Sequence, residues 1–127
     1  MKMNVNELTG SKLDWAVSKC DNTVWDDHKV ELYLFLKNHD NGFHNYSTNW
    51  SQGGPIIERE KIDLQQKFEG PEGSFATSVR WQARRHTYGG PINPPVFTAQ
   101  TPLIAAMRCY VASKLGNEID IPEDLNE

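Results

Sequence analysis

The chain has 127 residues but only two cysteines, and it has no apolar run near the roughly 20 residues that a membrane-spanning helix needs. Cys20 and Cys109 lie among apolar neighbours, so we expect small buried side chains in a reducing compartment. A zinc site would need more ligands at closer spacing. Residues 1–8 have no apolar segment typical of a secretion signal. We therefore expect a cytosolic protein without a membrane partner.

A strong charge of either sign is also missing, since 13 Lys and Arg face 17 Asp and Glu, for a net charge of −4. Binding to DNA or RNA regardless of sequence needs clustered cations, so we expect neither as a partner. Gly-x-Ser-x-Gly, P-loop, His-Glu-x-x-His and Cys-x-x-Cys motifs are absent. The four histidines fall at no metal-ligand spacing: His28, His39, His44 and His86. The sequence thus predicts no catalytic residues, no metal and no cofactor.

Two segments have the apolar spacing of helices. In residues 9–20, Leu13, Ala16 and Val17 recur on one face. In residues 101–115 a longer apolar stripe follows Thr101, an N-cap candidate, and ends before Gly116, which suits a left-handed stop. The chain is thus predicted to carry a helix near each end.

Strands are expected between the two helices. The candidates are 30–36, 43–46, 56–62 and 77–84, with loops at 46–55, 65–74 and 86–98. We therefore predict a single α+β domain over residues 1–127. Its antiparallel sheet of three or four strands carries the N-terminal and C-terminal helices packed on it. Residues 118–127 are expected to be a flexible, solvated acidic tail.

Three stretches carry a family resemblance: Glu7–Cys20, Tyr46–Glu60 with its Trp-Ser-Gln-Gly-Gly-Pro motif, and Thr101–Gly116. Together they resemble NinX, a family of small proteins of lambdoid and related enterobacterial phages and prophages. The resemblance implies phage origin and a location in the host cytosol. It implies no established chemistry.

The first candidate site is the segment from Trp50 to Arg59. Backbone N–H groups at Gly53 and Gly54 could cradle an anion beside the flat Trp50 ring. Alternatively, the glycines only permit a tight turn and Trp50 is a core residue. The segment therefore predicts either a ligand-binding loop or a packed connection.

The second candidate is the only local basic cluster, Arg80, Arg84, Arg85 and His86, with Tyr88 beside it. Guanidinium groups suit phosphate and aromatic rings suit base stacking. Alternatively, these arginines form a solvated strand face paired with Glu58, Glu60 or Asp63. Thr101 adds a possible anion site at a helix N-terminus, although ordinary capping also explains it.

Two classes of function stay open. One is a non-enzymatic protein that sequesters a small nucleotide-like ligand, such as a host anti-phage immune signal. The other is a factor that binds a host or phage protein and no small molecule. A pocket requires the arginines to converge with Trp50 and the two glycines. We also expect a homo-oligomer, with a dimer as the first guess, because the two-faced strand at 32–36 brings more apolar surface than two helices can cover.

Overall fold

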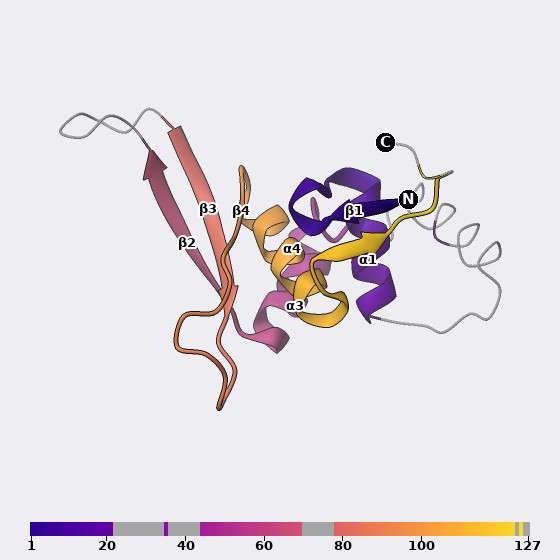
Figure 1. Ribbon diagram of the computed structural model, residues 1–127. Helices are drawn as coiled ribbons and strands as arrows, with labels where there is room; N and C mark the ends of the chain where they lie inside the picture. Colours follow the sequence, from indigo (N-terminus) through magenta and orange to yellow (C-terminus); the bar gives the residue numbers. More distant parts are fainter. Residues whose placement is uncertain (22–34, 36–43, 70–77, 124, 126–127) are drawn as a thin grey trace.

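The computed structural model describes residues 1–21, 35, 44–69, 78–123 and 125 (Figure 1). The predicted strand at 30–36 lies outside these residues, apart from Phe35. Within the described part the fold is an α+β mixture, as predicted, with a three-stranded and a two-stranded antiparallel sheet. In chain order the elements are β1 (Lys2–Asn4), η1 (Val5–Glu7), α1 (Gly10–Asp21), α3 (Trp50–Glu60), β2 (Ile62–Glu69), β3 (Ser78–Arg85), β4 (Phe97–Ala99), α4 (Pro102–Leu115) and β5 (Glu118–Asp120).

The larger sheet has the strand order β2-β3-β4. Strand β3 confirms the prediction for residues 77–84, with Ala83 fully buried and Trp81 half-buried on the inner face. Trp81 is opposite Ala99 in the register and Ala83 is opposite Phe97. Because opposite residues share a face of the sheet, this apolar set forms the side on which a helix packs.

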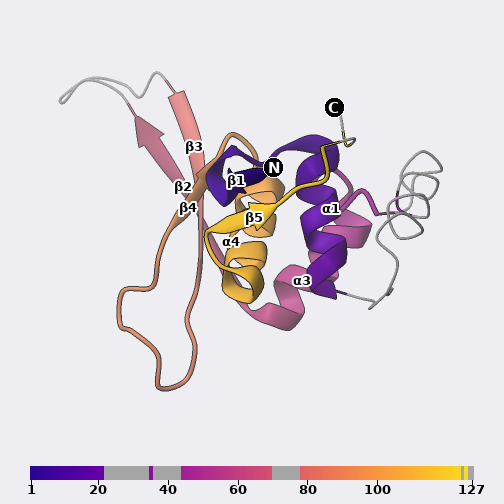
Figure 2. The ribbon, with the colours of Figure 1, turned by 45° about the vertical axis from the view of Figure 1, so that its right-hand side comes forward.

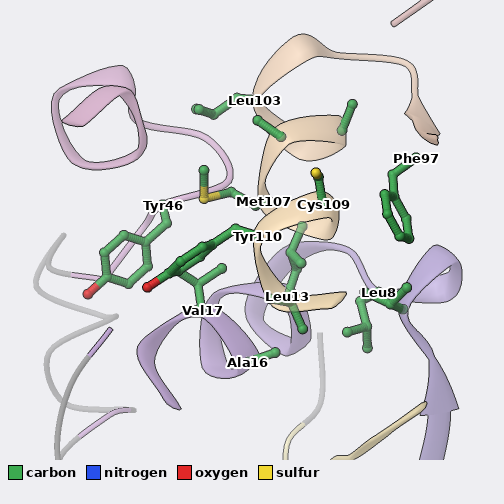
Figure 3. Close-up of a cluster of buried hydrophobic side chains, with 14 of the residues drawn as sticks. Leu8, Leu13, Ala16, Val17, Tyr46, Phe97, Leu103, Met107, Cys109 and Tyr110 are labelled. Carbon is green, nitrogen blue, oxygen red and sulfur yellow. The ribbon is translucent and has the colours of Figure 1, made fainter. Parts of the chain in front are cut away.

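Helix α4 is that helix, and it lies at the centre of the molecule (Figures 1 and 2). As predicted, Thr101 caps it and Gly116 ends it with a φ of 90°. Its buried residues surround nearly the whole helix, which is expected of a helix covered on several sides. In Figure 3, Cys109 lies on the side of α4 that faces Phe97, which belongs to the sheet. Met107 and Tyr110 lie on the side of α4 that faces Val17 and Tyr46.

Helix α1 packs against α4. The prediction placed both terminal helices on the sheet, but in the structure α4 separates the bulk of α1 from it (Figure 2). Trp15 is buried together with the predicted apolar face. Asp14 is buried too, and its Oδ1 accepts a hydrogen bond from the backbone N–H of Ser47 at 2.8 Å. This bond ties the turn before α3 to α1.

Residues 50–60 form helix α3, so the predicted loop at 46–55 holds only for the turn at 46–49, and the predicted strand at 56–62 is wrong up to residue 60. Asn49 caps the helix through its side chain, which accepts from the N–H of Ser51 at 2.9 Å. Gly53 and Ile56 are buried toward α4, and a Cβ at Gly53 would lie 2.5 Å from Leu103 Cδ1. Tertiary packing therefore outweighs the helix-breaking tendency of Gly-Gly-Pro.

Two neighbouring predictions also need correction. Residues 44–46, the described part of the strand expected at 43–46, lie in a bend and a turn. Residues 65–69, expected to begin a surface connection, belong to β2. This strand begins where Lys61 adopts a left-handed φ of 54° and ends α3. Strand β2 is therefore placed later in the chain than the sequence indicated.

The described part of the predicted tail, residues 118–123 and 125, is held against the N-terminus. Strand β5 pairs antiparallel with β1, and Ile119 lies opposite Met3. Ile119, Ile121 and Leu125 are buried, so this segment contributes to the core instead of being a solvated end. The N–H of Ile121 donates to the carbonyl of Met1 at 2.8 Å.

Candidate functional site

The two glycines of the first candidate site do not form a cradle. The N–H of Gly53 donates to the carbonyl of Asn49 at 2.9 Å within the first turn of α3, so it is not available to an anion. A Cβ at Gly53 would lie 2.4 Å from the carbonyl oxygen of Tyr46. Gly54 also lies inside the helix. The role of Gly53 is therefore close packing.

Trp50, by contrast, is not a core residue. Trp50 is the first residue of α3, and it is 53% exposed. It lines a hollow of about 240 Å³ beside the start of α4, together with Thr48, Thr101 and Ile104. Thr101 caps α4 as its sequence predicts, with Oγ1 accepting from the N–H of Ile104 at 3.1 Å. Of the first candidate segment, Trp50 thus remains available to a ligand, and it lies near Thr101.

Arg59 and Arg85 are committed to Glu60, whose side chain is 10% exposed. Arg59 Nε donates to Glu60 Oε2 at 3.0 Å, and Arg85 Nε donates to the Glu60 backbone carbonyl at 3.0 Å. Lys114 Nζ lies 3.3 Å from Glu60 Oε1. Burial alone would raise the pKa of Glu60, but the bonds from Arg59 and Lys114 and the charges of Lys114 and Arg85 outweigh it and lower this pKa. We read this group as a structural ion cluster joining α3, β3 and α4.

Arg84 and Tyr88 do not join Trp50 either. Arg84 lies opposite Asp63 in the register, on the outer face of the sheet, in a shallow hollow with Gln65 and Gln82. His86 Nε2 lies 3.4 Å from Asp63 Oδ2. Tyr88 is fully exposed on the connection between β3 and β4. The positions of Arg84 and His86 beside Asp63 match the alternative of a strand face paired with acidic residues.

Arg80 leads to a polar hollow that the sequence did not predict. The hollow has a volume of about 340 Å³ and lies where β4 meets η1 and the starts of α1 and α4. Arg108, on the second turn of α4, contributes a second guanidinium group. The remaining lining is mostly uncharged and polar, with Asn6, Thr9, Thr98 and Gln100.

Arg108 is held in place by backbone carbonyls. Its Nε donates to the carbonyl of Leu8 at 3.0 Å, and its Nη1 donates to that of Thr98 at 2.7 Å. Burial, and secondarily the positive charge of Arg80, lower the pKa of Arg108. Within the described ranges, neither arginine forms an ion pair with a carboxylate. The two cations therefore face one hollow with no opposite charge among the described residues.

The two hollows flank the same end of α4. Ile104 lines both, with Trp50 and Thr101 on one side and Arg80 and Arg108 on the other. An anion between the guanidinium groups would offset their repulsion, and the exposed indole offers a stacking surface nearby. We call this set of five residues the α4 N-terminal site. It combines two guanidinium groups, the capped start of α4 and an exposed aromatic ring.

Arg108 could have been suspected from the sequence, because it is the only charged residue within the run of buried side chains from Leu103 to Val111. Asn6 and Thr9 gave no such signal, since only the tertiary fold brings them beside β4.

Other chemistry finds little support in the described part of the chain. Burial raises the pKa of the Cys109 thiol to about 11, so this side chain is a protonated, buried thiol as predicted. Cys20 is partly buried. No group of three His, Cys, Asp or Glu side chains that could hold a metal ion occurs among the described residues. Nor is any described helix long and apolar enough to cross a membrane.

The fold and site together define a small α+β protein with a basic, polar hollow at the start of its central helix. A family model described as "Bacteriophage P22, NinX" matches residues 4–114, which is most of the chain. The protein therefore belongs to the NinX family of phage proteins, as the three sequence motifs predicted. No curated protein matches the sequence.

Proposed function

We propose that this phage accessory protein binds a small nucleotide-like ligand at the α4 N-terminal site and sequesters it without turnover in the host cytosol. The observation that carries the proposal is the pair Arg80 and Arg108, two guanidinium groups facing one hollow in a protein of net charge −4. A planar guanidinium group can donate two parallel hydrogen bonds to the oxygens of one phosphate group. Trp50 supplies an exposed ring across Ile104.

The lining of the site favours binding over chemistry. None of the residues around the larger hollow is an Asp, Glu, His or Cys, so the described lining has no general base or thiol nucleophile. Since the family is one of phage proteins, a ligand of this kind would be a nucleotide signal of the host defence.

The experiment is a thermal-shift panel of inorganic phosphate, 5′-mononucleotides, cyclic mononucleotides and cyclic dinucleotides. A ligand at 100 times its dissociation constant should stabilise the native state by about 2.7 kcal/mol, a shift of several degrees. A positive compound would then be titrated calorimetrically. Chromatography of the recovered compound would show whether it returns unchanged, and multiple-turnover product would refute sequestration without turnover.

The structure supplies a matched pair of variants for this experiment. Arg80→Ala removes a cation of the site, whereas Arg84→Ala removes an arginine on the same strand and outer face that does not line it. Arg80→Ala should weaken binding at least tenfold, since hydrogen bonds to charged groups contribute about 1.5–3 kcal/mol. Arg84→Ala should leave the affinity unchanged. Equal affinity for both variants and the wild type would refute the site.

Trp50→Ala tests the second half of the site. Loss of stacking should cost about 1–3 kcal/mol of binding. Because the indole is 53% exposed, the melting temperature should change little. The affinity for inorganic phosphate, or for a ligand without a ring, should be the same in this variant as in the wild type.

A separate observation favours the second class, a protein-interaction factor. The connection between β3 and β4 exposes three large apolar side chains, Tyr88, Ile92 and Val96. Large exposed apolar side chains close together are typical of protein interfaces. Isotope-labelled protein titrated with a purified candidate partner would show resonance changes at Ile92 under this alternative, and at Arg80 and Trp50 under the first.

A further inference from the structure

Strand β2 forms one outer edge of the larger sheet, and among the described residues no strand pairs with its free side. It is eight residues long, which is long for an unprotected edge. Figures 1 and 2 show the far end of the β2–β3 hairpin projecting beyond the helices. Phe68, on the inner face near this end, is 63% exposed. This edge therefore leaves both hydrogen-bonding groups and apolar surface open to a partner.

The charges along β2 are complementary to those of a second copy of the same strand. If two copies pair antiparallel about a two-fold axis at Gln65, Asp63 of each copy lies opposite Lys67 of the other. An axis at Leu64 or Gln66 would instead place Asp63 opposite Gln65 or Glu69, with no opposite charge. Residues that lie opposite each other in antiparallel strands point to the same face of the sheet. A two-fold axis normal to the sheet therefore pairs odd-numbered residues with odd-numbered ones and even-numbered residues with even-numbered ones.

The same register also matches the apolar residues. On the inner face, Phe68 of one copy lies opposite Ile62 of the other, an aromatic and β-branched pair that favours strand pairing. We propose that two copies of this chain associate through β2 in this register, forming a continuous six-stranded antiparallel sheet. The interface is isologous, so the Asp63–Lys67 pair and the Ile62–Phe68 pair each occur twice.

Two single charge variants test the register. Asp63→Lys places Lys opposite Lys67 twice in a homodimer, and Lys67→Asp places Asp opposite Asp63 twice. Each should weaken self-association about tenfold or more. An equimolar mixture of the two variants restores opposite charges at both pairs and should form a heterodimer. Native mass spectrometry and light scattering distinguish these species.

A wild-type monomer at about 100 μM would overturn the proposal. So would single variants that dimerise as tightly as the wild type, or a mixture that stays monomeric although both variants are folded. Should Asp63→Lys fail to fold, because it faces Arg84 and loses its contact with His86, a second variant decides. Gln65→Cys should form an intermolecular disulfide at the axis, whereas the control Gln82→Cys on β3 should not. Absence of that disulfide would overturn the proposal as well.

Discussion

The adjacent glycines in α3 should respond differently to alanine. At Gly53, an added Cβ would lie 2.4 Å from the Tyr46 carbonyl oxygen and 2.5 Å from Leu103 Cδ1, closer than atoms can approach without movement. At Gly54, the nearest atom would be Trp50 Cε3 at 3.9 Å, an ordinary contact. Both residues lie in the helix, but Gly54 directly precedes Pro55, whose ring disfavours the helical conformation of a residue that carries a Cβ, so the gain in helix propensity is smaller at Gly54.

The magnitudes follow from this difference. Replacing Gly by Ala inside a helix stabilises the fold by about 0.5–1 kcal/mol, but the ring of Pro55 offsets part of this gain at Gly54, so Gly54→Ala should change the melting temperature by no more than a few degrees. Overpacking costs about 1–3 kcal/mol, and a clash with backbone leaves little room to relax. Gly53→Ala should therefore lower the free energy of unfolding by about 1–2 kcal/mol after the propensity gain.

Chemical denaturation of the two variants beside the wild type measures both effects. If residues 50–55 were a glycine-dependent loop, Gly54→Ala would destabilise the fold at least as much as Gly53→Ala. A neutral or stabilising Gly53→Ala would likewise refute the close packing of α3 against α4.

Two further predictions concern the ion cluster and the C-terminal segment. Because the pKa of Glu60 is lowered from its ordinary value of 4.5 on folding, its contribution to stability is present above that value and is lost as the pH falls below it. The stability difference between the wild type and Glu60→Gln, measured by denaturation from pH 7 to 3, should therefore shrink toward acid, and a constant difference would contradict the cluster. Ile121→Ala, at a fully buried position, should cost about 2–5 kcal/mol in the same assay, whereas a solvated tail would make it neutral.

The sequence predicted those elements whose signals are local. Residues 101–116 combine a capping Thr, a Pro at the first helical position and a Gly stop, and α4 matches them. Alternation of large and polar residues likewise located β3. These patterns depend on backbone geometry within a few residues, so they can be recognised without knowledge of the fold.

Tertiary contacts explain the failures. Gly53-Gly54-Pro55 is typical of a turn, and it becomes helical because Gly53 allows α3 to approach Leu103 closely. The Asn49 cap was a usable signal for this helix. Ile119 is buried only because β1 pairs with β5, a contact between the two ends of the chain.

The candidate site was predicted in part. Arg80, Trp50 and Thr101 reach the same end of α4, whereas Arg59 and Arg85 turn to Glu60 and Arg84 faces the outer hollow. Strand alternation could not separate Arg80 from Arg84, since both lie on one face. Their different surroundings come from the end of β4, which leaves Arg80 beside Arg108.

The most direct test of the α4 N-terminal site is an NMR titration of the side-chain Nε–Hε groups of arginine and the indole N–H of tryptophan with a 5′-mononucleotide and with inorganic phosphate. We predict saturable shifts at Arg80 and Arg108 with both compounds, and at Trp50 with the nucleotide alone, while Arg84 stays unchanged. Unchanged Arg80 and Arg108 resonances at millimolar concentrations of both compounds, or equal shifts at Arg84 and Arg80, would contradict binding at this site.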